Sequence, residues 1–434
     1  MKKIIGVAAP HYKNTAGHSP EQIPVPATVR LPMKMHSGAA AKPVVRVGDT
    51  VLVGQLIGCA DTGGRVSAPV HASVSGTVKS IDESDIVTGQ KSVSIVIASD
   101  GAQTVHESVS PKTVTNKAAF LQAVHDSGAV GLGGAGYPTA PKLTLKEGTK
   151  LDYILINGAE CEPYITSDTR TMIDDAEYVY EGARLLKTYL EPENVVICIE
   201  SNKPEAIKKM RALTDGTPGL SVHVLPSAYP QGERKVLVYN VTGRIVPEGG
   251  RLTDVGCIVT NCTTIAVIAK YIMTGLPLVS KIVTVDGSGV KSPKNVIAPI
   301  GTPIRDLFAY CGGLREDTGK IIMGGPMMGE AVPSLDMPVV KVTNAVLALA
   351  GKDAVPAMPT ACIKCGRCVT NCPMKLMPSM IEEALALKKI ETLKKCKVNM
   401  CAECACCAYI CPSKRPLAQV MTLSKNLLWE ASRK

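Results

Sequence analysis

The sequence predicts a multidomain α/β protein with all-β and α+β modules and a cysteine-rich helical tail. Short β-branched segments between glycine turns dominate the first quarter of the chain. Apolar strands then alternate with amphipathic helices, and two cysteine runs lie near the C-terminus. A length of 434 residues is enough for several domains. We expect four parts, at residues 1–110, 111–265, 266–318 and 319–434.

Composition and charge limit the class of protein. Sixteen cysteines and no secretion signal at Met1–Gly6 favour a reducing compartment and metal ligation over disulfides. No stretch is long and apolar enough for a transmembrane helix. A net charge of +10 favours an acidic partner or an anionic membrane surface, whereas nucleic acid is disfavoured because stacking aromatics are few. We expect a cytoplasmic protein, either free or peripheral on the cytoplasmic face of a membrane.

The two cysteine runs share one spacing. Residues 362–373 and 401–412 both fit C-x2-C-x2-C-x3-C-P, the run that binds cubane iron–sulfur clusters in bacterial ferredoxins. Thiolates at i, i+3 and i+6 on a tight loop can converge on one cluster, and the fourth cysteine, beside proline, ligates the other cluster. We assign one [4Fe–4S] cluster to Cys362, Cys365, Cys368 and Cys411, and the second to Cys401, Cys404, Cys407 and Cys372.

Other uses of these cysteines fit less well. A pair of zinc knuckles is possible in principle, but two matching four-cysteine runs that both end in Cys-Pro are not the zinc pattern. Disulfides are less favoured still. Cys396 and Cys406 fall outside the runs, and we interpret them as small packing residues.

The N-terminal part predicts a small all-β unit after an irregular arm. Residues 47–57 and 66–79 alternate β-branched and small residues between Gly-Asp and Gly turns. The phrases V-G-D-x-V-x-x-G-Q and A-P…S-G-x-V resemble the barrel-sandwich hybrid fold of biotinyl and lipoyl domains. The modified-lysine hairpin of those carriers is not visible. We therefore interpret the unit as structural or docking.

The next part predicts an open, largely parallel sheet. The expected strands are 151–156, 194–200 and 221–225, and the expected helices are 117–127, 174–190 and 203–213. Ligands of such sheets lie at the carboxyl ends of strands. Three segments fall near those ends, at residues 128–142, 157–162 and 229–235.

Each of these segments also has a plainer interpretation. The glycines of the first could admit a phosphate or a ring edge, or could simply form a tight turn. Lys142 could bind a phosphate or be solvated, and Glu160 and Glu162 could be surface carboxylates. A strand near residue 258 then leads into a helix over 265–274, with Thr263 or Thr264 near its start.

The remaining sequence predicts a small α+β module and a tail. A hairpin is expected over residues 279–290 and a helix over 303–311. The glycine- and methionine-rich residues 321–329 favour a packing turn. Two helices are expected in the tail, at 379–389 and 416–431.

The motifs together resemble a known family over nearly the whole chain. G-L-G-G-A-G-Y-P-T-A-P-K, N-G-A-E-C-E-P, Y-P-Q-G-E-R-K and T-N-C-T-T are similar to flavin-contacting segments of the flavin- and NADH-binding subunit of respiratory complex I. The order of parts resembles the RnfC family, the C subunits of the Rnf ferredoxin:NAD+ oxidoreductase complex, and relatives such as the proline-reductase-associated electron transfer protein. Arg234 stands where an acid would be expected.

This resemblance implies a complex I flavin-subunit-like domain, a β-grasp (SLBB) module and a two-[4Fe–4S] ferredoxin-like tail. It implies non-covalent FMN, NAD(H) and no side chain acting as general acid or base. The implied cofactor-binding residues are Gly131, Gly133, Gly134, Gly136, Lys142, Asn157, Glu160, Tyr229, Gly232, Glu233, Asn261 and Thr264 for FMN, with Glu162 near NAD(H).

The implied function is that of an NADH dehydrogenase-type oxidoreductase, a component of a ferredoxin:NAD+ oxidoreductase that passes electrons between NAD(H), FMN and the clusters. The implied partners are other members of a membrane electron-transport complex, or a soluble reductase. Two alternatives stay open at this point. One is a soluble protein that feeds a dedicated reductase such as proline reductase, and the other is a cluster-only relay without a dinucleotide site.

Overall fold

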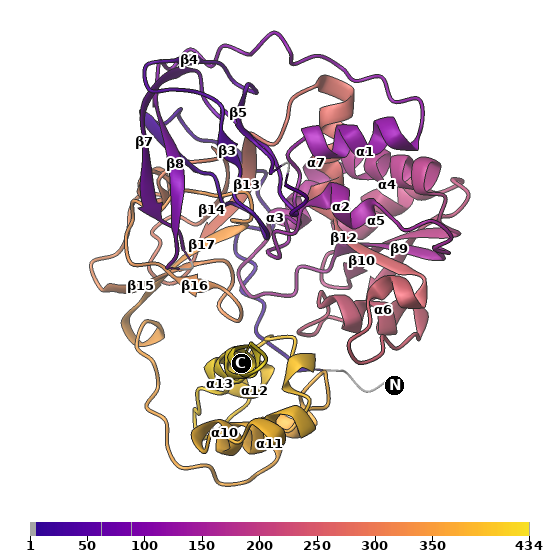
Figure 1. Cartoon of the computed structure of the whole chain (residues 1–434). Coiled ribbons are helices and arrows are strands. Elements are labelled where there is room, and N and C mark those ends of the chain that lie inside the picture. Colours follow the sequence, from indigo (N-terminus) through magenta and orange to yellow (C-terminus); the bar gives the residue numbers. More distant parts are fainter. Residues whose placement is uncertain (1–5, 62, 88, 434) are drawn as a thin grey trace.

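The computed structural model describes residues 6–61, 63–87 and 89–433. The first five residues, on which the expected lack of a secretion signal partly rests, lie outside these ranges. Figure 1 shows two β-rich units beside an α/β unit, with the helical C-terminal tail below them in that view. In the described ranges, no helix has both the length and the apolarity that a bilayer crossing requires.

The N-terminal part forms two small sheets around one core, as expected for an all-β unit. The first has the order β2 (Thr28–Pro32), β8 (Lys91–Ser99), β7 (Gly76–Asp85) and β4 (Thr50–Val51). The second has the order β3 (Lys42–Pro43), β5 (Leu56–Cys59) and β6 (Val70–His71). Leu31 and Ile95 of the first sheet and Ile57 of the second are fully buried in the shared core.

The α/β unit contains a four-stranded parallel sheet. Its order is β11 (Leu220–Leu225), β10 (Asn194–Glu200), β9 (Tyr153–Gly158) and β12 (Cys257–Asn261). The three strands expected from the sequence are present. The first begins at Tyr153, two residues later than expected, and continues through Asn157 and Gly158.

Among the described residues, seven helices belong to this unit. They are α1 (Lys117–Asp126), α2 (Thr139–Leu143), α3 (Ser167–Asp174), α4 (Ala176–Leu190), α5 (Pro204–Thr214), α6 (Arg234–Thr242) and α7 (Cys262–Thr274). The sequence did not predict α3, since S-D-T-R-T-M-I-D lacks apolar periodicity although most of it is buried. A short 3-10 turn, Leu252–Val255, precedes β12.

The start of α7 corrects one expectation. The helix begins at Cys262 and not at residue 265, so Thr263 and Thr264 lie in its first turn. Asn261 is the N-cap, and its side chain accepts from Thr264 N at 3.2 Å. Asn261 is the last residue of β12 and has extended backbone angles. Because β12 passes directly into α7, the capping side chain comes from the strand end.

The third unit contains a six-stranded sheet. Its order is β1 (Glu21–Gln22), β14 (Lys294–Pro299), β13 (Ser280–Asp286), β17 (Ala345–Ala350), β15 (Thr318–Met323) and β16 (Glu330–Ala331), with helix α8 (Ile304–Tyr310). Of the hairpin expected over residues 279–290, only β13 lies in that range, because its antiparallel partner β14 begins later, at Lys294. The N-terminal arm is thus partly ordered, because β1 pairs with β14.

The tail is helical and has a core of its own. Its helices are α9 (Arg367–Thr370), α10 (Pro378–Ala386), α11 (Ile390–Lys395), α12 (Cys406–Tyr409) and α13 (Leu417–Ala431), and its 3-10 turns are Gly351–Asp353 and Val398–Met400. Ile381, Leu393 and Val398 are fully buried in its core. Helix α10 ends earlier than expected because Lys388 adopts a left-handed φ of 48°.

Candidate functional site

Two asparagines mark the carboxyl edge of the parallel sheet. Asn157 of β9 and Asn261 of β12 are paired in register. Asn157 Nδ2 donates to Gly232 O at 3.0 Å, and Asn261 Nδ2 lies 3.5 Å from Asn157 O. Three segments that the sequence singled out therefore meet at the edge where open α/β sheets bind ligands.

The glycine-rich loop joins the same edge through Thr264. Leu132 N donates to Thr264 Oγ1 at 3.0 Å, and this hydroxyl donates to Val130 O at 3.1 Å. A Cβ at Gly133 would lie only 3.1 Å from Asn261 Nδ2, so glycine at this position lets the loop backbone approach the Asn261 side chain closely. A Cβ at Gly134 would meet open space, although its φ of 112° favours glycine.

The loop is also a closed turn, which confirms the plainer interpretation of its glycines. Gly136 N donates to Gly131 O at 3.0 Å, and Gly136 has a φ of 62°. The turn presents the open side of Gly134 beside the asparagines, which leaves room for the ring or phosphate of a ligand.

Glu160 is directed into the protein. Its carboxylate accepts from Asp168 N at 2.6 Å and from Thr169 N at 3.2 Å, at the start of α3. Burial raises the pKa of Glu160 above its ordinary value, and the ammonium of Lys13 opposes that rise. The carboxylate thus stabilises the N-terminus of α3. The same two bonds fix the position of Glu160, whose backbone has a left-handed φ of 50°.

Glu162 holds a second loop against the site. Its two carboxylate oxygens accept from Met327 N at 3.0 Å and from Met328 N at 2.9 Å. Burial raises the pKa of Glu162 to about 7. A Cβ at Gly325 would lie 2.3 Å from Glu162 Oε2, so the loop can approach only because glycine is there. The packing turn expected at residues 321–329 is shorter than expected, because residues 321–323 belong to β15. The remaining turn, residues 324–329, folds over Glu162.

Tyr229 and Glu233 form the third segment. Tyr229 is 1% exposed, precedes a cis peptide bond to Pro230, and has a buried hydroxyl without a hydrogen-bond partner among the described residues. Glu233 is the N-cap of α6 and accepts from Lys235 N at 2.8 Å and Val236 N at 2.9 Å. The unpartnered Tyr229 hydroxyl is thus available to a ligand, whereas Glu233 Oε2 is already occupied by two backbone amides.

Two cations lie close together beside this segment. Burial, together with the smaller effect of the nearby guanidinium of Arg234, lowers the pKa of Lys142 to about 8. Arg234 is exposed at the first position of α6. A lysine and an arginine near a helix N-terminus suit a phosphate. The sequence signalled Lys142 but not the contribution of Arg234.

Sequence reasoning missed several residues that shape the site. Lys13 Nζ of the N-terminal arm donates to the carbonyl oxygens of Glu160, Glu162 and Ile165 at 2.6–2.8 Å. Asp168 accepts from Asn261 Nδ2 at 2.7 Å. No local pattern could have identified these residues, because their partners lie far away in the sequence.

The cysteines assigned to the second cluster line one recess. Cys372, Cys401, Cys404 and Cys407 all contribute to it, as the crossed assignment of the fourth ligand requires. Cys406 lines the same recess and is fully buried, and its thiol donates to Tyr229 O at 3.8 Å. The donor set and its convergence fit a [4Fe–4S] cluster.

The first run also meets the end of the second. Thr360 N donates to Ser413 O at 2.9 Å, and Ser413 Oγ donates to Ala361 O at 2.9 Å. These bonds bring the chain around Cys362 to the chain around Cys411, again as the crossed assignment requires. Among the described residues, no three His, Cys, Asp or Glu side chains lie close enough to ligate a single metal ion.

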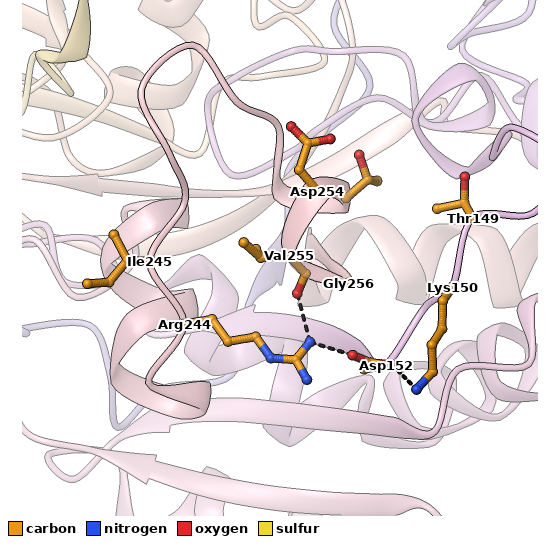
Figure 2. A pocket seen from close by; sticks show the side chains of 9 residues that line it. Thr149, Lys150, Asp152, Arg244, Ile245, Asp254, Val255 and Gly256 are labelled. Carbon is orange, nitrogen blue, oxygen red and sulfur yellow. Dashed lines mark hydrogen bonds and ion pairs between the residues drawn. The ribbon is translucent and has the colours of Figure 1, made fainter.

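A hollow of about 590 Å³ lies elsewhere, at the amino-terminal edge of the same sheet. Figure 2 shows Arg244 between Asp152 and the carbonyl of Val255, with Lys150 on the other side of Asp152. These charges are paired with one another, and none of the predicted site residues lines the hollow. The candidate site is therefore the opposite, carboxyl edge.

Comparison with protein families gives three matches. The Nuo51 FMN-binding domain matches residues 124–270, the RnfC barrel sandwich hybrid domain residues 2–102, and the SLBB domain residues 282–331. The Nuo51 match covers all four segments that converge at the carboxyl edge. A solved NAD+-reducing [NiFe]-hydrogenase chain matches 74% of this chain and 62% of its own, with 17% identity and a TM-score of 0.48.

Curated relatives extend over most of the chain. The C subunit of a proton-translocating ferredoxin:NAD(+) oxidoreductase complex from Clostridium ljungdahlii is 40% identical over 85% of this chain and 81% of its own. The Na(+)-translocating counterpart from Acetobacterium woodii is 39% identical over 87% of this chain and 86% of its own. These identities and coverages show that the chain belongs to the RnfC family, the C subunits of Rnf ferredoxin:NAD(+) oxidoreductase complexes.

Proposed function

We propose that this chain transfers electrons between NAD(H) and one-electron carriers through a non-covalent FMN and two [4Fe–4S] clusters, as a ferredoxin:NAD+ oxidoreductase component. One observation carries the proposal. The four segments that match the flavin family meet at the carboxyl edge of the sheet, and the second cysteine loop packs against one of them through Cys406 and Tyr229. A flavin, when bound, can exchange a hydride with NAD(H) and single electrons with clusters.

The residues at this edge fit an FMN. Gly134 leaves open space above the loop, and the buried Tyr229 hydroxyl lacks a partner among the described residues. Lys142 and Arg234 supply positive charge suited to the phosphate. Asn157 and Asn261 would orient the ring edge from the two strand ends. Glu162 would border the dinucleotide on the side covered by residues 324–329.

The cysteine-rich tail lies next to this edge. Besides the Cys406 contact, Lys397 Nζ lies 2.8 Å from Glu248 Oε2, so an ion pair joins the tail to the α/β unit. Tyr229, Cys404 and Cys406 belong to one buried apolar cluster. This packing supports electron exchange between the flavin site and the tail, because electron transfer requires cofactors that are held close together.

We further propose the four-part division at residues 1–110, 111–265, 266–318 and 319–434, and a place at the cytoplasmic face of a membrane. The RnfC and Nuo51 matches and the separate core of the tail support this division in outline. The SLBB match and the six-stranded sheet run past residue 318, so the third part extends further along the chain than this boundary gives it. The relatives are subunits of ion-translocating complexes. Membrane attachment would then come through partner subunits.

Cofactor analysis of anaerobically purified protein tests the proposal. We expect one FMN and about eight iron and eight sulfide per chain. Protein that holds the clusters but no flavin after reconstitution would instead be a cluster-only relay. Protein with flavin that reacts only with a dedicated reductase, and not with NADH, would be a soluble feeder protein. Either result would overturn the proposed activity.

A further inference from the structure

We propose that the face around the first cysteine loop, residues 362–368, is the docking site for an acidic one-electron carrier protein. This inference rests on the proposed function, and it adds which of the two cysteine loops meets the partner and what charge the partner carries. We call this surface the outer face. It consists of Met358, Ile363, Lys364, Arg367 and Lys414 around Cys362 and Cys365.

The positive charge of the chain is concentrated in the tail. Residues 354–434 contain 13 Lys and Arg and five Asp and Glu, so this fifth of the chain carries +8 of the +10 net charge. No Asp or Glu occurs between Ala354 and Ile381, a stretch that contains the whole first run. The acid Glu382, which lies beside this run in space, is paired with Arg415, whose guanidinium also donates to Thr360 O. A carrier that approaches the run therefore meets a net positive charge, which favours an acidic partner.

The outer face is exposed. Cys362 and Cys365 are both exposed, as are Lys364, Arg367 and Lys414. The two apolar side chains of the outer face are also strongly exposed to solvent, Met358 at 84% and Ile363 at 67%. Exposed apolar residues ringed by charges are typical of protein interfaces.

The second cysteine loop, residues 401–407, is not accessible enough to serve as this docking surface. Cys404 and Cys407 are buried. The loop packs against the flavin segment, where Cys406 Sγ donates to Tyr229 O, and its acid Glu403 is already paired with Lys425. The second cysteine loop therefore adjoins the candidate flavin site, and the first cysteine loop remains accessible to a partner protein.

The route of the chain supports this division of roles. In Figure 1 the segment after β17 leaves the six-stranded sheet and runs along the outside of the tail before the helices begin. Residues 355–363 on this segment are all exposed. The first run thus follows directly from an exposed connection, and its first two cysteines, Cys362 and Cys365, stay exposed, whereas its last, Cys372, is buried in the tail core.

The electrons balance with a one-electron carrier as the partner. Oxidation of NADH removes a hydride, which supplies two electrons and releases its proton to solution. Each NADH therefore reduces two oxidised carriers, giving NAD+, one H+ and two reduced carriers. In the reverse direction, two reduced carriers and one proton convert NAD+ to NADH.

Charge reversal on the outer face tests the proposal. The variant is the triple change Lys364→Glu, Arg367→Glu and Lys414→Glu in the full, cluster-loaded chain. The matched control has the same change in net charge at exposed lysines of other units, Lys79→Glu, Lys117→Glu and Lys208→Glu. The probe is a small acidic ferredoxin, and its Kd is measured anaerobically at several salt concentrations.

We expect the outer-face variant to bind the probe at least tenfold more weakly than the control does, with a flatter dependence of Kd on salt. NADH-dependent reduction of ferricyanide, flavin content and iron content should be equal in all three proteins. If the wild type itself lacked flavin, iron or NADH-dependent ferricyanide reduction, the proposed function would fail, and this result is distinct from a failure of docking.

Equal Kd values for the variant and the control would overturn the docking proposal. So would wild-type protein that ignores the acidic ferredoxin but binds phosphatidylglycerol vesicles through the same three residues. That outcome would assign the outer face to an anionic membrane surface.

Discussion

Lys13 Nζ donates to the carbonyl oxygen of Glu160 at 2.8 Å, although the two residues are 147 positions apart. The same ammonium also reaches the carbonyls of Glu162 and Ile165. These three carbonyls belong to a loop in which Glu160 and Tyr164 have left-handed φ angles of 50° and 69°. The N-terminal arm thus holds the candidate site in a conformation that the loop would not adopt by itself.

Replacing Lys13 should loosen this loop. In Lys13→Met, three carbonyls lose a charged donor, which should lower the stability of the α/β unit by about 2 kcal/mol and reduce FMN retention. Thermal unfolding and flavin content after gel filtration measure both effects. Lys117→Met, at an exposed position of α1, serves as the control. Equal flavin retention in the two variants would show that Lys13 does not position the site.

Removing the paired cations should weaken phosphate binding. Lys142→Ala or Arg234→Ala should each raise the Kd for FMN about tenfold or more, because a charge-assisted hydrogen bond contributes roughly 1.5–3 kcal/mol. Lys146→Ala, at an exposed position after α2, should leave it unchanged. The Kd is measured by fluorescence titration of apoprotein with FMN. If Lys146→Ala raised the Kd for FMN more than Lys142→Ala or Arg234→Ala did, the FMN phosphate would not lie beside Lys142 and Arg234.

Glu162 should make stability depend on pH. Burial raises its pKa from the ordinary 4.5 to about 7, so the folded chain binds this proton more tightly than the unfolded chain does. Its contribution is therefore full below about pH 4.5 and is lost as the pH rises through about 7, by roughly 3 kcal/mol in all.

Glu162→Gln keeps a neutral side chain at every pH, so the decline in Tm between pH 5 and pH 8 should be smaller than in the wild type. Glu205→Gln, at an exposed position of α5, is the matched control. An unchanged Tm profile in Glu162→Gln would contradict the burial of this carboxyl in solution.

The assignment of eight cysteines as cluster ligands predicts different results for Cys372, inside the first run, and Cys396, outside both runs. Cys372→Ser should remove a ligand of the second cluster and lower the iron content from about eight to about four per chain. Cys396→Ser should leave the iron content unchanged, because Cys396 lies outside both runs and packs against the tail core. Iron and sulfide analysis of the two variants decides the assignment. Equal iron losses would mean that Cys396 is a ligand.

The sequence predicted those features that are encoded locally. Asn194–Glu200 forms β10 over the expected residues, because a continuous apolar run specifies a buried parallel strand. The convergence of Asn157 and Asn261 followed from strand ends that meet at one edge. The cysteine spacing likewise predicted the recess that Cys372 shares with Cys401.

The features that sequence reasoning missed depend on contacts between distant segments. The sequence shows Glu160, Glu162 and Glu233 as candidate ligands of cofactors. It cannot show that backbone amides bind both carboxylate oxygens of Glu160 and Glu162 and one oxygen of Glu233. The role of Lys13 was hidden for the same reason. Helix α3 was missed because its polar residues are buried through specific hydrogen bonds, which hydrophobic periodicity does not report.

The most direct test of the proposed electron path is an anaerobic titration of the cofactor-loaded chain with NADH, followed by absorbance and by electron paramagnetic resonance. We expect the flavin absorbance to bleach and the cluster signals to change in the same protein without any partner. Full bleaching of the flavin with clusters that stay oxidised would mean that the junction at Cys406 and Tyr229 does not carry electrons. No response of the flavin to NADH would contradict the central claim.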